Sequence, residues 1–292
     1  MVSRPRAMGE VLFTAFIWGF SFVAAKWTMN GIGPMWALTI RFTLAALLTA
    51  PWWLFRFDRH HARIAFPVGV VLGATLLLQL IGLNYTTVAK SCFITVLYVV
   101  WIPFAEGLFF KRWPPYSHLI WVLIALVGTA LMSELKTDEW NRGDALTLLC
   151  SLASAVHILL VGKIQTKIRS GFTFNLYQNV WAGLIPLCAA LLMEPLPQFP
   201  LQPLAISGLL FNAIVVSILA FWIQVRAQGA ISPSVISLLF LLESPFAALF
   251  GYLCLGETLN PPQFLGGFLI LLSAVGTIRD QLRPTQLAIV EV

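Results

Sequence analysis

The apolar runs of this chain constrain its fold more than any other feature. Ten of them follow one another along the 292 residues, each close to the ~20 residues that an α-helix needs to cross the hydrocarbon core of a bilayer. Their approximate bounds are 9–28, 33–55, 64–83, 86–109, 117–133, 143–163, 172–193, 203–224, 232–255 and 262–278. Charged residues make up only 10% of the chain, whereas soluble domains contain about 25%. The sequence therefore predicts an all-α integral membrane protein with ten transmembrane helices.

The positive charges predict how the helices are oriented. If the N-terminus is cytoplasmic, 13 of the 18 Lys and Arg residues lie in cytoplasmic segments, and only Lys136 and Arg142 lie in outer loops. This is the distribution that the positive-inside rule describes. A nine-helix alternative, which would join the third and fourth runs around Asn84, is inconsistent with this distribution of positive charge. We expect a multi-pass protein of the cell inner (plasma) membrane with both termini cytoplasmic. The net charge of +6 then reflects orientation in the lipid bilayer and requires no nucleic-acid partner.

Three short sequence motifs occur once in each half of the chain. Pro-Phe-Ala occurs at 103–105 and 245–247, Pro-Pro at 114–115 and 261–262, and Val-Gly-Thr at 127–129 and 275–277. We therefore expect two five-helix repeats, at 1–135 and 136–280, and a short cytoplasmic tail at 281–292. Because five is odd, the two repeats must enter the membrane from opposite sides, which makes them an inverted pair. Such pairs exchange conformations, and this exchange is the basis of alternating access.

Several motifs resemble those of a known family. In the first half they are Trp-Gly-Phe-Ser-Phe at 18–22, Pro34, Arg41-Phe42 and Asn84-Tyr85-Thr86 through Pro103; in the second they are Ser-Pro-Ser at 232–234, Leu-Glu-Ser-Pro at 242–245, Gly256-Glu257 and Gly266-Gly267. Over nearly the whole chain this pattern resembles the EamA family of the drug/metabolite transporter (DMT) superfamily. The resemblance implies two inverted EamA domains, a central cavity between them, and export or import of a small organic solute. The first half departs from the pattern by having Lys111-Arg112 where the second has Gly256-Glu257, so equal roles for the halves do not follow.

Three cations fall inside the predicted helices, where each costs ~2.5–3.5 kcal/mol and calls for a reason. Lys26, Arg41 and Lys90 all lie in the outer half of the first repeat. If they face a common cavity, they attract a carboxylate or a phosphate. Alternatively, Lys26 and Lys90 extend to the membrane surface, since both lie within two turns of a helix end. For Arg41, which lies ~10 Å deep, both interpretations remain equally open.

One acid and one histidine fall near the bilayer centre. Of the 12 acidic residues, only Glu243 is placed there, two residues before Pro245. A carboxylate at that depth suits a proton-coupling or substrate-ammonium site, and a structural ion pair is the alternative. His157, in the middle of the sixth run, suits titration near neutral pH or, alternatively, a hydrogen-bonded packing role. Trp18, Gln79 and Tyr98 complete the candidate solute and coupling residues as aromatic and polar walls.

The remaining residues bear on the class of function. Cys92, Cys150, Cys188 and Cys254 lie singly in four different runs, without the spacing of a metal site or a disulfide, and no metal or cofactor is expected. A membrane enzyme would need convergent nucleophiles, paired acids or metal ligands, so we expect no enzyme. We expect secondary transport, with export favoured, of small organic metabolites such as amino acids, and with the proton as candidate coupling ion. A sugar-phosphate or nucleotide-sugar exchanger is the main alternative, because it would use the same cations.

Overall fold

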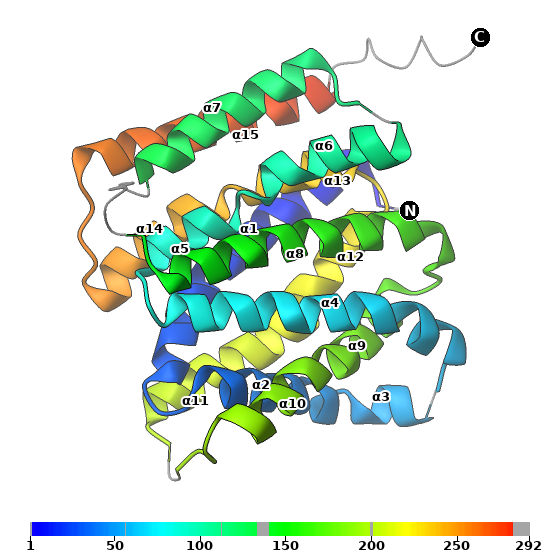
Figure 1. The fold of residues 1–292 in the computed structure, drawn as a ribbon. Helices are drawn as coiled ribbons and strands as arrows, with labels where there is room; N and C mark the ends of the chain where they lie inside the picture. Colours follow the sequence, from blue (N-terminus) through cyan, green and yellow to red (C-terminus); the bar gives the residue numbers. More distant parts are fainter. Residues whose placement is uncertain (1, 56, 112, 133–139, 199–200, 283–292) are drawn as a thin grey trace.

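The computed structural model describes residues 2–55, 57–111, 113–132, 140–198 and 201–282, and these residues form helices joined by short turns (Figure 1). The first half contains α1 (Arg4–Met29), α2 (Pro34–Leu48), α3 (Ala50–Phe55), α4 (Arg59–Leu83), α5 (Val88–Thr95), α6 (Tyr98–Phe110) and α7 (Tyr116–Met132). The second contains α8 (Arg142–Ile164), α9 (Gly171–Ala182), α10 (Leu184–Met193), α11 (Pro203–Leu210), a π-helical segment (Phe211–Ala220), α12 (Phe221–Ala227), α13 (Pro233–Phe240), α14 (Glu243–Leu255) and α15 (Pro261–Leu282). Proline begins α2, α11, α13 and α15, where its missing N–H costs nothing.

The helical segments fall on the ten predicted apolar runs. Within the described residues, eight segments are long and apolar enough to cross a membrane, and two further apolar helices, Pro34–Leu48 and Tyr116–Met132, are shorter. The prediction of an all-helical membrane protein is therefore confirmed, while the crossing of the bilayer by all ten segments stays a prediction. Most of the predicted tail, 283–292, lies outside the described residues.

Two runs that the sequence suggests as continuous helices are broken in the middle. Turns at residues 96–97 and 241–242 separate α5 from α6 and α13 from α14. In the second case the cause is Pro245, which has no N–H to donate to the carbonyl of Leu241. That carbonyl instead accepts from the N–H of Ser244, at 3.1 Å, which tightens the turn. Glu243 therefore begins a helix and does not lie within one.

The helices form a bundle in which the two halves interlock. α1 packs against α11, α12 and α14; α4 packs against α8 and α9; and α2 packs against α11 and the π-helical segment. α7 and α15 form a pair along one side of the bundle (Figure 1). This pair crosses closely because it meets at glycines: a Cβ on Gly128 would lie 2.6 Å from the carbonyl oxygen of Gly266.

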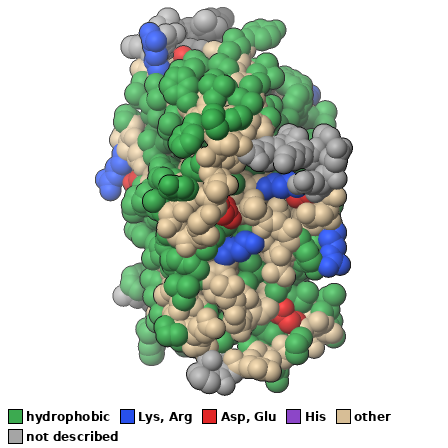
Figure 2. Space-filling view, turned by 90° about the vertical axis from the view of Figure 1, so that its left-hand side faces the viewer, with side chains coloured by type: hydrophobic (Ala, Val, Ile, Leu, Met, Phe, Trp, Pro, Cys, Tyr) green, Lys and Arg blue, Asp and Glu red, His purple; other side chains and the backbone are tan. Residues whose placement is uncertain are grey.

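Large apolar side chains cover the outside of the bundle, as a lipid-facing surface requires. Leu108, Leu123, Leu192 and Phe268 are each at least 60% exposed. We call the end at which α1 begins and α15 ends the terminal end, and the opposite end, where α1 turns into α2, the distal end. Figure 2 looks onto the distal end, where a few charged side chains lie near the middle and others at the edges, among many hydrophobic side chains.

Candidate functional site

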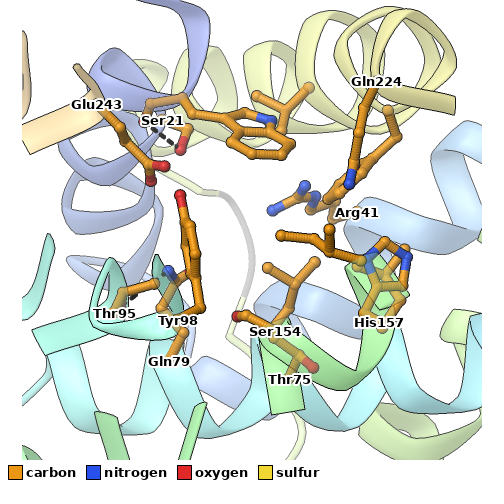
Figure 3. A pocket seen from close by; sticks show the side chains of 16 residues that line it. Ser21, Arg41, Thr75, Gln79, Thr95, Tyr98, Ser154, His157, Gln224 and Glu243 are labelled. Atoms are coloured by element: carbon orange, nitrogen blue, oxygen red, sulfur yellow. Dashed lines mark hydrogen bonds between the residues drawn. The ribbon is translucent and has the colours of Figure 1, made fainter. Parts of the chain in front are cut away.

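A cavity of about 60 Å³ lies in the middle of the bundle, between the two halves (Figure 3). Its walls come from α1, α2, α4, α5, α6, α8, the π-helical segment, α12 and α14. Six of the eight candidate residues from the sequence line it: Trp18, Arg41, Gln79, Tyr98, His157 and Glu243. Further polar side chains line it as well: Ser21, Thr75, Thr95, Ser154 and Gln224.

Glu243 supplies the negative charge of the cavity. The residue is 4% exposed, and its carboxylate points into the cavity on the same side as the hydroxyl of Tyr98 (Figure 3). Within the described residues the carboxylate forms no hydrogen bond or ion pair. Glu243 is the first residue of α14. In the described part of the chain, this buried acid is thus held without a cation beside it.

Arg41 supplies the positive charge from the opposite side of the cavity (Figure 3). Its Nε donates to the hydroxyl of Ser217 at 2.8 Å, which joins α2 to the π-helical segment of the other half. Its Nη2 is buried without a hydrogen-bond partner among the described residues. One part of the guanidinium is therefore anchored to protein, and another part remains available to a ligand.

Other buried polar atoms around the cavity also lack partners among the described residues. They are Nε1 of Trp18, the hydroxyl of Tyr98, and both side-chain polar atoms of Gln224. The Trp18 ring itself is held by aromatic neighbours, with its centroid 4.5 Å from that of Phe240 and 5.4 Å from that of Phe221. A buried polar atom without a partner costs about 1–3 kcal/mol. Several of them converging on one cavity indicate that a polar ligand or water fills the space.

Besides Arg41, two further candidate side chains that line the cavity form hydrogen bonds within the protein. A ring nitrogen of His157, Nε2, lies 3.2 Å from Oε1 of Gln178. The amide of Gln79 donates to the hydroxyl of Thr95 at 3.3 Å. Both residues therefore have a structural role in addition to lining the cavity, and the packing role that the sequence suggests for His157 gains support.

Lys26 and Lys90 do not line the cavity. The ammonium group of Lys26 donates to the carbonyl of Thr86 at 2.7 Å. That of Lys90 pairs at 2.9 Å with the carboxylate of Asp144, at the start of α8. Both contacts lie at the distal end, so of the three cations within the predicted helices the structure brings Arg41 alone to the cavity.

Arg41 also borders two smaller cavities, of about 20 Å³ each. The first shares Ser21 and Gln79 with the main cavity. The second extends toward the distal end, past Thr28 and Asn212. Arg41 is common to all three cavities, and the last of them reaches Thr28, near the distal end of α1.

Polar contacts between the halves lie on both sides of the main cavity. At the terminal end, Arg226 of α12 donates to both carboxylate oxygens of Glu10 on α1, at 2.7 and 3.1 Å. At the distal end lies the pair between Lys90 and Asp144. The cavity thus lies between contacts that join the halves at its two ends.

The small hydroxyl residues of the cavity are not among the sequence candidates. Ser and Thr are frequent in transmembrane helices, where they commonly bond their own backbone, as Ser21 does to the carbonyl of Trp18 at 2.6 Å. Their sequence positions carry no signal that separates cavity from packing roles. Gln224, deep in an apolar run, does carry such a signal, because a long amide inside a membrane calls for a partner.

Comparison with known proteins gives the family. The profile of the EamA-like transporter family matches residues 7–134 and 141–279. An uncharacterized transporter of Archaeoglobus fulgidus is 28% identical, over 94% of this chain and 86% of that protein. A solved crystal structure matches with a TM-score of 0.73 at 14% identity, covering 96% of this chain and all of the other.

A further relative carries a more specific name. The S-adenosylmethionine/S-adenosylhomocysteine transporter of Chlamydia muridarum is 25% identical, over 92% of this chain and 90% of that protein. Taken together with the two matched segments, which account for most of the chain, these findings assign it: this protein belongs to the EamA-like transporter family, within the drug/metabolite transporter superfamily.

Proposed function

We propose that this transporter carries small zwitterionic solutes with an amino-acid head group, by alternating access between two inverted five-helix repeats. The observation that carries the proposal is the pair of opposite charges, Arg41 and Glu243, on opposite sides of one central cavity. A zwitterion matches this arrangement because it brings one charge of each sign and leaves the occupied site neutral.

Each charged group of such a solute has a partner in the cavity. The carboxylate accepts from the free Nη2 of Arg41, a charge-assisted bond of the strong kind. The ammonium group donates to Glu243. Trp18 and Tyr98 offer aromatic surface to the rest of the molecule and, through their unpartnered N–H and O–H groups, further hydrogen bonds.

The name of the chlamydial relative is consistent with this solute class. S-adenosylmethionine and S-adenosylhomocysteine each end in an α-amino-acid group, with one ammonium and one carboxylate; S-adenosylmethionine carries a sulfonium charge in addition. At 25% identity the relative does not identify the solute of this protein. It does make these two compounds natural members of a test panel.

The packing of the helices supports the inverted repeats. α1 packs against α14, as α8 packs against α5 and α6. α1 packs against α11 and α12, as α8 packs against α4, and α2 meets α11 as α9 meets α4. Exchanging the helices of residues 1–135 with those of 136–280 thus reproduces these contacts, which is the relation expected of two repeats related by a pseudo-two-fold axis.

We assign proton coupling to Glu243. Without a protein cation beside it, this carboxylate is balanced by the solute ammonium when the cavity is loaded. When the cavity is empty, a bound proton takes the place of that ammonium, so the return step carries a proton. The termini are proposed to be cytoplasmic in the plasma membrane, as the charge distribution predicts.

A phosphate-bearing solute, as in a sugar-phosphate exchanger, fits less well. It needs two or more cations in the cavity, and Lys26 and Lys90 are held by Thr86 and Asp144 at the distal end. Glu243 would in addition repel it. The cavity charges therefore favour the zwitterion.

Counterflow in proteoliposomes tests the proposal. Vesicles containing the purified protein are loaded with one unlabelled solute, and uptake of a labelled zwitterionic, anionic or cationic solute is measured with and without a pH gradient. Amino acids, S-adenosylmethionine and a sugar phosphate form the panel. Accumulation of a zwitterion, at least tenfold above protein-free vesicles, is expected. Counterflow of the sugar phosphate without any zwitterion would overturn the proposal.

A further inference from the structure

Two carboxylates connect the broken spans α5–α6 and α13–α14 across the halves. Near the end of α6, Glu106 accepts from the backbone N–H of Ser234 at 3.1 Å, and from the hydroxyl of the same residue. Just after α14, Glu257 accepts from the backbone N–H of Val88 at 3.0 Å. Ser234 lies in the first turn of α13, and Val88 is the first residue of α5.

These contacts are reciprocal. The carboxylate near the last turn of each span binds the first turn of the other span, so one contact lies at the terminal end and the other at the distal end (Figure 1). In both cases a negative charge meets the positive end of a helix dipole and a free N–H group. The two contacts are therefore chemically equivalent although they lie on opposite sides of the cavity.

The backbone at the ends of the two spans is equivalent as well. α6 is followed by Lys111 with φ = 54°, and α14 by Gly256 with φ = 70°. These are the two residues with positive φ in the described part of the chain. The carboxylates are placed differently around this common turn, since Glu106 precedes Lys111 whereas Glu257 follows Gly256. The first half lacks an acidic residue just after this turn, and Glu106, within α6, supplies the carboxylate instead.

The same two spans carry cavity residues at their breaks. Thr95 ends α5, Tyr98 begins α6, and Glu243 begins α14, and all three line the cavity. A helix broken at its middle tilts as two short rigid pieces. A solute that binds at the breaks can therefore move the ends of the pieces, where the carboxylate contacts lie.

Resting on the proposed alternating access, we infer that Glu106 and Glu257 are the gating residues of this transporter, each holding one side closed. The contact of Glu106 with Ser234 closes the terminal side and opens when the cavity faces that side. The contact of Glu257 with Val88 does the same for the distal side. Only one of the two breaks at a time in the transport cycle, and both are formed in the occluded state.

The test measures access to the cavity from each side, without any solute. A cysteine introduced at Ser154, which lines the cavity, is labelled with a membrane-impermeant maleimide in right-side-out and in inside-out membrane vesicles. Vesicles of the same variants without the introduced cysteine give the background from Cys188 and Cys254, which are exposed.

Two variants weaken each contact. At the terminal side these are Glu106→Gln and Ser234→Ala. At the distal side they are Glu257→Gln and Val88→Pro, the latter removing the N–H donor at a first-turn position where proline is tolerated. Thr87, before it, already has the extended backbone that proline requires, with φ −75° and ψ 162°. Ser170→Ala, which removes the cap of α9 within one half, is the control for loss of a cap alone.

The terminal pair of variants is expected to raise the labelling rate from the terminal side at least threefold and to lower it from the distal side. The distal pair is expected to do the reverse, and the control to change neither. Equal changes from both sides, or no change in a folded variant, would overturn the gating roles. Because labelling needs no transported solute, this result is independent of whether the zwitterion proposal holds.

Discussion

Nε of Arg41 on α2 donates to the hydroxyl of Ser217, in the π-helical segment of the other half, at 2.8 Å. This bond crosses the interface between the halves and orients a guanidinium that lines the cavity. A π-helical turn is uncommon and often marks a functional position. Here it places the side chain of Ser217 beneath the guanidinium, while its carbonyl accepts from Asn175 and Asn179.

Ser217→Ala tests this orienting role. Loss of the hydroxyl leaves the charge of Arg41 in place but no longer fixes the orientation of its guanidinium. The affinity for a zwitterion should therefore fall about threefold to tenfold, as expected for one hydrogen bond. Equilibrium binding in detergent measures the change. Thr75→Ser, a small change at a lining residue that bonds its own helix, is the control. Equal affinities in Ser217→Ala and wild type would remove the orienting role.

Gly19 and Gly9 on α1 predict opposite effects of the same substitution. A Cβ on Gly19 would lie 2.5 Å from Cβ of Phe246 and 2.9 Å from the backbone N of Ala247, whereas one on Gly9 meets nothing within 4 Å. Gly19→Ala should therefore lower the free energy of unfolding by about 1–3 kcal/mol through overpacking against α14. Gly9→Ala should leave it unchanged or raise it. Thermal unfolding in detergent compares the stability of the two variants. If Gly19→Ala is as stable as Gly9→Ala, the close approach of α1 and α14 is contradicted.

Asp58 predicts a loss of stability in acid. Its carboxylate caps α4, and the hydrogen bond from the side chain of His61, at 2.7 Å, lowers the pKa of Asp58 below its ordinary value of 3.8. A lowered pKa means that this contribution is present above about pH 4 and is lost as the pH falls through the value in the folded protein. Asp58→Asn keeps the cap but removes the charge. The difference in melting temperature between wild type and Asp58→Asn should therefore shrink as the pH falls below about 4. A difference that stays constant with pH would mean that the charge of Asp58 does not contribute to stability.

Glu243→Gln separates charge from shape at the coupling site. The variant should fold and insert normally, since the amide has the same size and can hydrogen-bond. Transport driven by a pH gradient should be lost, because the amide cannot take up a proton. Uptake into proteoliposomes with an imposed gradient measures the effect. Full transport with unchanged pH dependence would reduce Glu243 to a packing residue.

The sequence predicts the helices well because the bilayer permits few alternatives. The apolar runs locate the segments, and the rarity of charge within them singles out Arg41 and Glu243. The helix breaks after Thr95 and before Glu243 cannot be predicted from the sequence. A proline does not mark such a break reliably, because Pro67 lies within the unbroken helix α4. The partners of Lys26 and Lys90 are Thr86 and Asp144, which lie 60 and 54 positions further along the chain. Likewise, the position of Glu106 against Ser234 depends on packing between residues 128 positions apart, which no local pattern encodes.

The central claim, that Arg41 and Glu243 together recognise a zwitterion, is tested most directly by comparing two ligands. Binding of the best zwitterion from the solute panel and of its analogue without the amino group is measured for wild type and for Glu243→Gln. Wild type should bind the zwitterion about 10–100-fold more tightly than the analogue, the value of a charge-assisted hydrogen bond. In Glu243→Gln that preference should fall to about threefold or less. If the variant keeps the full preference for the amino group, Glu243 does not bind the solute and the account is wrong.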